Sequence, residues 1–126
     1  MMSMPIQGEV TSAGINATFN LFKELNLRVY GFDGSTSVTV SDPTILTWGA
    51  ASSGALHATN IEGQSYVSVV PIQVGTQVTK VIISKVTNPT IEDAIAEFDL
   101  SQTLDFPNGG NLIIGSLSLI LQSGGE

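Results

Sequence analysis

The fold is decided by residues 76–121, which hold three apolar segments: TQVTKVIISKV (76–86), AIAEFDL (94–100) and NLIIGSLSLIL (111–121). The first and third are rich in Val, Ile and Leu, which favour buried strands. Turn-forming sequences separate the segments, Asn88-Pro89 after the first and PNGG (107–110) before the third. We therefore predict three β-strands that form the scaffold of the core.

The middle segment fits two interpretations. In a helix, Thr90 would cap the first turn, Asp93 would complete a capping box, and Ile95 would face inward. In a strand, Asp93, Glu97 and Asp99 would face water, and Ile95 would turn to that charged side. The inward residues of the strand would be Ala94, Ala96, Phe98 and Leu100. Strands on both sides and a short turn at residues 88–89 favour the strand, with Phe98 in the core.

The chain before residue 76 predicts one helix and several short strands. Ile15, Phe19 and Phe22 follow a helical stripe over residues 12–25, which Thr11 or Ser12 would cap, although Ile15, Ala17, Phe19 and Leu21 also alternate. Asp33-Gly34 predicts a hairpin turn, since glycine readily adopts the positive φ of such turns. Further strands are expected at residues 25–30, 37–40, 44–49, 55–59 and 64–70. In the first of these, Leu25, Leu27 and Val29 would face inward and Tyr30 outward.

These elements predict an all-β fold with one short N-terminal helix. Short strands at regular intervals, separated by Gly, Pro and Asn turns, are typical of an antiparallel β-sandwich, with a jelly roll as one form of it. The length predicts a single domain over residues 1–126. Residues 1–11 would form an N-terminal arm and residues 122–126 a frayed polar tail.

The composition excludes several classes of function. The net charge is −7 and the four basic residues, Lys23, Arg28, Lys80 and Lys85, form no cluster, so neither nucleic acid nor an anionic membrane is an expected partner. No apolar run is long enough to span a membrane, and the first residues lack the pattern of a secretory signal. The absence of cysteine excludes disulfides and a thiol nucleophile.

No catalytic or cofactor motif is present in the sequence. His57 is the single histidine and has no second metal-binding or triad partner nearby in the sequence, so we expect an ordinary surface residue. PNGG (107–110) lacks the pattern of a phosphate-binding loop. Glu92, Asp93, Glu97 and Asp99 form an acidic cluster, for which a solvated strand face is favoured over a calcium site or a pair of glycosidase carboxylates. We therefore predict no enzyme activity, no cofactor and no metal.

Three aromatic residues bear on partner binding: Trp48, Tyr30 and Tyr66. Trp48 lies in an apolar segment and is expected in the core, whereas Tyr30 is expected to be exposed. Exposed aromatic rings could stack on a sugar, so a carbohydrate-binding or adhesin module is the alternative function.

Several stretches of the chain are similar to a family of small bacteriophage virion proteins, of the tail-fibre or minor structural type. The helix has the form Asn16-Ala-x-Phe19-Asn-x-Phe22, and the likeness is best over residues 76–121. The other matching stretches are TWGAASSG (47–54), TQVTKVII (76–83), AEFDLS (96–101) and NGGNLIIGSLSLIL (108–121). The chain departs from the family where the Asp33-Gly34 turn replaces a longer segment containing Asp-Pro.

The resemblance implies a β-sandwich, a location on the virion after assembly in the host cytoplasm, and no catalysis. A short acidic module suits a capsid decoration (cement) protein or a component of the tail or baseplate. Such modules act as symmetric homo-oligomers, most simply trimers on threefold sites. We expect other virion proteins as partners. The predicted contact residues are Met4, Pro5 and Ile6 in the arm, with Tyr30 and Asp33.

Overall fold

The computed structural model describes residues 3–4, 10–50 and 54–121, and these form mostly antiparallel β-structure with one α-helix, as predicted. The predicted tail, residues 122–126, lies outside the described residues. The elements in chain order are α1 (Ser12–Glu24), β1 (Arg28–Asp33), β2 (Thr36–Ser37), β3 (Ala55–His57), β4 (Ser68–Ile72), β5 (Thr76–Ser84), a 3₁₀ turn η1 (Ile91–Asp93), β6 (Ala96–Phe106), β7 (Gly110–Ile114) and β8 (Ser118–Ile120).

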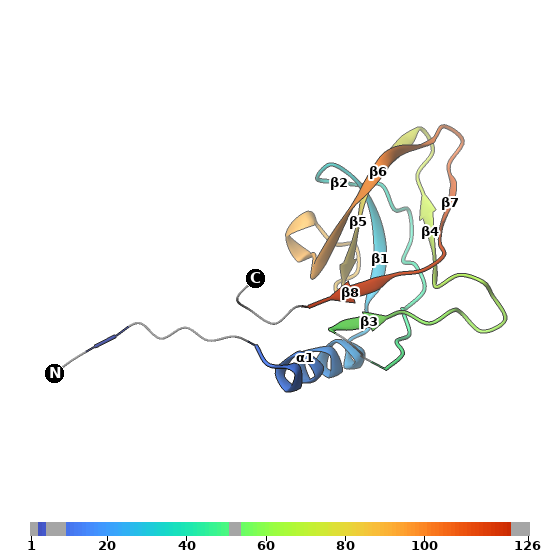
Figure 1. The fold of residues 1–126 in the computed structure, drawn as a ribbon. Helices are drawn as coiled ribbons and strands as arrows, with labels where there is room; N and C mark the ends of the chain where they lie inside the picture. The colour runs from blue at the N-terminus through green and yellow to red at the C-terminus, as the bar shows by residue number, and fades with distance from the viewer. Residues whose placement is uncertain (1–2, 5–9, 51–53, 122–126) are drawn as a thin grey trace.

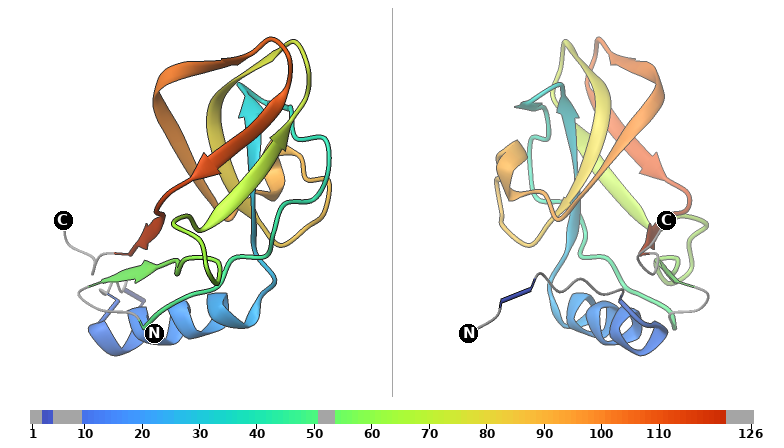
Figure 2. Two further views of the ribbon diagram at one scale, coloured as in Figure 1. Left: turned by 90° about the vertical axis from the view of Figure 1, so that its right-hand side faces the viewer. Right: turned by 60° about the vertical axis from the view of Figure 1, so that its left-hand side comes forward.

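The described strands form three antiparallel sheets. The largest has the order β2-β1-β5-β6, and the two smaller ones are the pairs β3-β8 and β4-β7. Figure 1 shows the four-stranded sheet and the β4-β7 pair at one end of the molecule, and α1 beneath the β3-β8 pair at the other. Figure 2 shows the same arrangement from two further sides. The helix thus packs at one end of the β-structure.

The helix α1 forms where the hydrophobic stripe predicted it. The side chain of Thr11 caps its first turn by accepting a hydrogen bond from the Gly14 N–H (3.2 Å). Ile15 and Phe19 are buried in the main hydrophobic cluster, and Phe22 packs against it. The helical alternative for residues 12–25 is therefore confirmed over the competing strand.

The main hydrophobic cluster joins residues from the helix and from most of the strands. Its buried members are Ile15, Phe19, Leu27, Val29, Val38, Leu46, Leu56, Val67, Val70, Ile72, Val78, Val81, Ile83, Leu117 and Leu119. Leu27 and Val29 face inward as predicted, and the Asp33-Gly34 turn joins β1 to β2 with a positive φ of 60° at Gly34.

The prediction that Tyr30 is exposed is wrong, because Tyr30 retains 2% exposure. Tyr30, Phe32 and Ile82 form a second buried cluster on the opposite face of the four-stranded sheet. Ile91 and Ala94, from the segment that connects β5 to β6, pack over this cluster. This connection therefore buries the face of β1 that the alternating sequence pattern predicted to be exposed to solvent.

Residues 90–100 combine both of their predicted interpretations. The Thr90 N–H donates to the Asp93 carboxylate (2.9 Å), as the capping box predicted, but the helix is a single 3₁₀ turn. The strand prediction is confirmed from Ala96 onward. The expectation that a strand would turn Ile95 to the charged side is wrong, since Ile95 precedes β6 and packs against the main cluster.

Other predicted strands differ in extent. Of the strand expected at residues 37–40 only Ser37 lies in β2, and the strand expected at residues 64–70 is β4, which begins at Ser68 and continues to Ile72. The segment 111–121 is not one strand: residues 115–117 separate β7, which pairs with β4, from β8, which pairs with β3. Residues 44–49 form no named strand and make one bridge, between Trp48 and Ala58. In segments 111–121 and 44–49 the chain changes its pairing partner. The alternation of residues within one segment does not show where such a change occurs.

Phe19→Ala should lower the free energy of unfolding by about 3–5 kcal/mol, because Phe19 is 1% exposed within the main cluster. The matched control is Leu21→Ala on the same helix, where the side chain is 63% exposed and the change should stay within about 0.5 kcal/mol. Phe98→Ala should cost less than Phe19→Ala, because Phe98 is half-buried. Urea unfolding followed by circular dichroism measures all three. Equal losses for Phe19→Ala and Leu21→Ala would contradict the position of α1.

Candidate interaction surface

An apolar area lies on the exposed side of the β4-β7 sheet. Residues of β4 alternate, with Ser68, Val70 and Ile72 buried and Val69 and Pro71 half-buried on the other side. Val69 pairs directly with Ile113, whose side chain is 51% exposed.

Val40 adds to this area from a third segment. The Val40 N–H donates to the Pro71 carbonyl (3.1 Å), and the Val40 side chain is 59% exposed. We call Val40, Val69, Pro71 and Ile113 the outer apolar face. Contiguous exposed apolar residues on a sheet are one feature of surfaces that bind a partner, so this face is a candidate contact.

Three turns meet at the end of the molecule opposite α1. They belong to the β1-β2, β4-β5 and β6-β7 connections, and together they line a shallow hollow of about 650 Å³. Asp33 and Thr36 line it from the first turn, Gln73 from the second and Asp105 from β6. The Gly75 N–H donates to the Phe106 carbonyl (3.0 Å), which ties the second and third turns together. The hollow offers carboxylate and amide groups to a polar partner.

Asp33 therefore lines a surface hollow, and its role as a contact residue stays a prediction. Val74 extends this end of the molecule, since it follows β4 in the second turn and is 67% exposed. A Cβ atom at Gly109 would come within 3.0 Å of a Val74 methyl group, and Gly109 has a φ of 70°. The positive φ and the short distance both favour glycine at position 109. The absence of a side chain there lets the third turn pack against the second.

Tyr30 forms the floor of a smaller polar hollow instead of an exposed contact. Its hydroxyl donates to Asp42 Oδ1 (3.1 Å), and the hollow of about 260 Å³ is also lined by Thr39, Thr87 and Asn88. Burial, followed by the hydrogen bond to Asp42 and the negative charge of Asp42, raises the pKa of Tyr30 from 10.0 to about 12. Nearby Arg28 opposes this shift of the pKa. Tyr30 stays neutral and contributes to stability.

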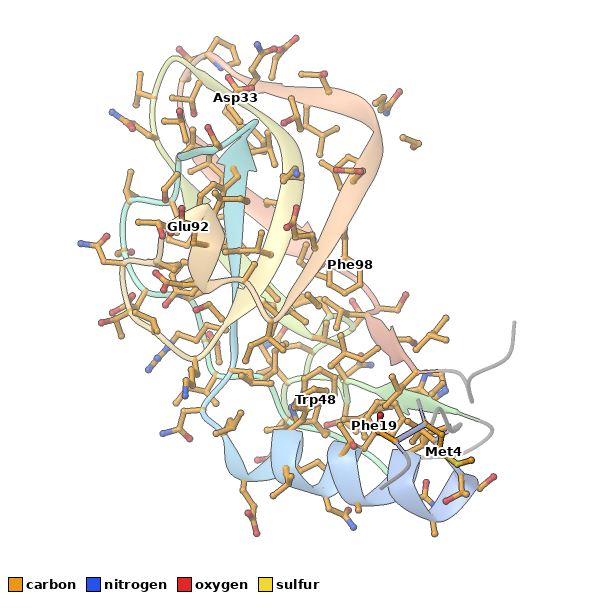
Figure 3. The ribbon with its side chains drawn as sticks, turned by 90° about the vertical axis from the view of Figure 1, so that its left-hand side faces the viewer. Met4, Phe19, Asp33, Trp48, Glu92 and Phe98 are labelled. Atoms are coloured by element: carbon orange, nitrogen blue, oxygen red, sulfur yellow. The ribbon has the colours of Figure 1, made fainter. Side chains whose placement is uncertain are left out.

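The predicted contact residues do not form one site. Met4 is 69% exposed, and Figure 3 places it at the α1 end of the molecule, whereas Asp33 lies at the opposite end. Pro5 and Ile6 lie outside the described residues. A partner that contacted both Met4 and Asp33 of one chain would have to extend along the whole molecule.

His57 is exposed, as predicted, and its Nδ1 is hydrogen-bonded to the hydroxyl of Ser118 (2.6 Å). Trp48 is half-buried against the main cluster, in agreement with its expected place in the core. Its ring nitrogen is buried without a hydrogen-bond partner in the described structure.

The acidic cluster is divided by the fold. Asp93 caps η1, while Glu97 and Asp99 lie on β6 and form ion pairs with Lys80 at 2.8 and 3.6 Å. Figure 3 shows Glu92 in the β5-β6 connection, away from Phe98 on β6. Among the residues that the structure describes, no three acidic, His or Cys side chains converge as metal ligands. The calcium interpretation therefore has no geometric support there.

The described helix is too short and too polar to cross a membrane.

Comparisons with protein-family models, with curated proteins and with solved structures found no match to this chain. A function must therefore be inferred from the surfaces described above. The sequence correctly predicted the hairpin turn at Asp33-Gly34. It did not predict the outer apolar face, because Val40, Pro71 and Ile113 meet only through the strand register.

Tyr30→Phe should remove an ionisation near pH 12 from the ultraviolet titration of the folded protein. Because the pKa of Tyr30 is higher in the folded chain than its ordinary value of 10.0, the neutral hydroxyl stabilises the fold below pH 10. That stability is lost as the pH rises from about 10 through about 12. The difference in unfolding free energy between wild type and Tyr30→Phe should therefore shrink over this range. Tyr66→Phe is the control, and a wild-type difference spectrum lacking the late ionisation would contradict the Tyr30–Asp42 contact.

Proposed function

We propose that the protein is a non-enzymatic structural component of a bacteriophage virion that binds other particle proteins. It would act as a capsid decoration (cement) protein or as a component of the tail or baseplate fibre. The resemblance of residues 16–22, 47–54 and 76–121 to small virion proteins supports the class. The outer apolar face is the observation that carries the binding function.

The outer apolar face has the properties of a protein contact. Val40 and Ile113 each expose more than half of their side chain, and the half-buried Val69 and Pro71 lie between them in the strand register. Burying apolar area stabilises a complex by about 25 cal/mol per Å². Val40 also lines the polar hollow that holds Asp42, so a partner that covers Val40 would meet a carboxylate at that margin of the face.

The proposed architecture is a β-sandwich. Val29, Val81 and Ile83 from the four-stranded sheet and Val70 and Ile72 from the β4-β7 sheet belong to one buried cluster, which supports two facing layers. A jelly roll has two larger sheets, whereas the described sheets contain four, two and two strands. We therefore propose the sandwich in preference to the jelly roll.

The proposed assembly is a homotrimer on the virion, formed in the host cytoplasm. Threefold positions of a particle favour trimeric partners, and each copy would present its own outer apolar face. Light scattering of the purified protein measures this state directly, with a trimer mass as the expected result.

The carbohydrate-binding alternative is less well supported. Stacking on a sugar needs an exposed aromatic face, and Tyr30 is 2% exposed while Trp48 is half-buried. Glycan binding that is lost on substitution of Tyr30 and Trp48, with the fold retained, would favour this alternative over particle binding.

The double variant Val40→Thr/Ile113→Thr should bind undecorated particles roughly ten-fold more weakly than wild type, because two apolar contacts are lost. The measurement is co-sedimentation of the purified protein with capsids and, separately, with tails, which also distinguishes the two positions on the virion. The control is Ile120→Thr, since Ile120 is 70% exposed on β8 and lies outside the face. Equal weakening by both variants would exclude the outer apolar face as the contact. Co-sedimentation of wild type with neither capsids nor tails would contradict the proposed function.

Deletion of residues 1–8 should abolish particle binding without changing the thermal unfolding transition, if the arm containing Met4, Pro5 and Ile6 makes the partner contact. The main cluster begins at Ile15, so the deletion removes none of its members. Calorimetry measures the transition and co-sedimentation measures binding. Unchanged occupancy on the particle would exclude the arm.

A further inference from the structure

The strand β6 has an unpaired edge. It is the outer strand of the four-stranded sheet and pairs with β5 on one side. In the described part of the chain, no other strand pairs with β6, and Figure 2 shows β6 at the margin of the sheet. The backbone N–H and C=O groups along such an edge can pair with an additional strand.

The inward side of β6 is incompletely covered. Its residues alternate between half-buried and exposed except at residues 101–103, which are all exposed, and none of the eleven is buried, whereas β5 beside it has five buried residues. The half-buried apolar residues are Ala96, Phe98, Leu100, Leu104 and Phe106. A strand added at this edge would cover these side chains with its own apolar residues.

The outward side of β6 is acidic. Glu97 and Asp99 share one cation, Lys80, and the side chain of Asp99 is still 85% exposed. Asp105 lies on the same side, since it pairs with exposed Gln77, and it is exposed too. Glu97 and Asp99 therefore share one ammonium group, and Asp105, opposite Gln77, adds a carboxylate that has no ion pair with Lys80.

We infer that the free edge of β6 binds an extended segment of a partner protein in which apolar residues alternate with Lys or Arg. The apolar residues would pack beside Phe98, Leu100 and Leu104, and the basic residues would lie beside Asp99 and Asp105. This inference rests on the proposed function and specifies the chemistry of the partner. The same carboxylates disfavour a second copy of this chain, because edge-to-edge pairing would bring two acidic rows together.

A register irregularity in β6 supplies a selective variant. Between the pairs Val78–Leu104 and Lys80–Asp99, residues 100–103 face the single residue Thr79. Gln102→Pro therefore removes no paired position in the register with β5. It should interrupt the hydrogen bonding of an incoming strand, since proline has no N–H group.

The probe is a labelled peptide of about nine residues that alternates Val and Lys, a typical strand length. Its counterpart has Glu in place of each Lys. Fluorescence anisotropy with the full chain should show saturable binding of the Lys peptide, weakened by salt, and none of the Glu peptide. Amide NMR shifts should locate the contact on residues 96–106.

Asp99→Asn/Asp105→Asn should weaken binding of the Lys peptide about five-fold. Glu62→Gln, an exposed carboxylate outside the sheet, should leave it unchanged. Gln102→Pro should abolish binding, and the Asn variants keep the test decisive if this variant does not fold.

Equal binding of the two peptides would overturn the inference, as would retention of full affinity by Asp99→Asn/Asp105→Asn or by folded Gln102→Pro. Dimerisation that blocks the β6 amides would also overturn it, in favour of a second copy. Failure of peptide binding with intact capsid co-sedimentation would reject the β6 site alone. Peptide binding without co-sedimentation would reject the proposed virion function alone.

Discussion

The pairing of β1 with β5 is the constraint on which the other elements depend, because both of these strands are covered on both faces. Val29 and Ile83 are paired in the register and belong to the main cluster, while Tyr30 and Ile82 are paired and belong to the second. A sheet covered on both faces needs two separate coverings. The β4-β7 pair and α1 contribute to one, and the β5-β6 connection with η1 provides the other.

The close packing around β1 also restricts the type of residue that can occupy position 31. A Cβ atom at Gly31 would lie 2.9 Å from Ile72 Cδ1, so glycine lets β4 approach the centre of β1. The Gly31 N–H donates to Thr39 Oγ1 (2.7 Å), which fixes residues 38–40 between β1 and β4. Val40 is consequently held beside Pro71, on the exposed side of β4. The outer apolar face is thus positioned by the same contacts that form the core.

The sequence predicted those features that depend on local pattern. The stripe of Ile15, Phe19 and Phe22 identified α1. The Thr90–Asp93 capping box was recognised only in the less favoured helical interpretation, and it forms at the single turn η1. Features set by distant contacts were missed. Tyr30 is buried because Ile91 and Ala94 cover it, sixty residues later in the chain, and no pattern within residues 25–30 encodes that covering. The break after β7 was missed although Gly115 and Ser116 interrupt the apolar residues of segment 111–121, where the pairing partner changes from β4 to β3. The proposed interaction surfaces depend on register, so the sequence did not indicate Val40 as a contact, and Asp33 remains a predicted contact residue that lines a surface hollow.

The two proposed surfaces would contribute different terms to recognition. The four residues of the outer apolar face are all apolar, so they would supply affinity through buried area and discriminate weakly between apolar partners. The backbone groups of the β6 edge would fix the orientation of a bound strand. Asp99 and Asp105 would supply selectivity, because they repel an acidic strand. The overall charge of −7 acts in the same direction, because it also opposes edge-to-edge pairing between copies of the chain. The acidic residues of β6 would therefore serve two purposes in the proposed assembly: they would oppose pairing between the β6 edges of two copies, and they would favour a basic partner.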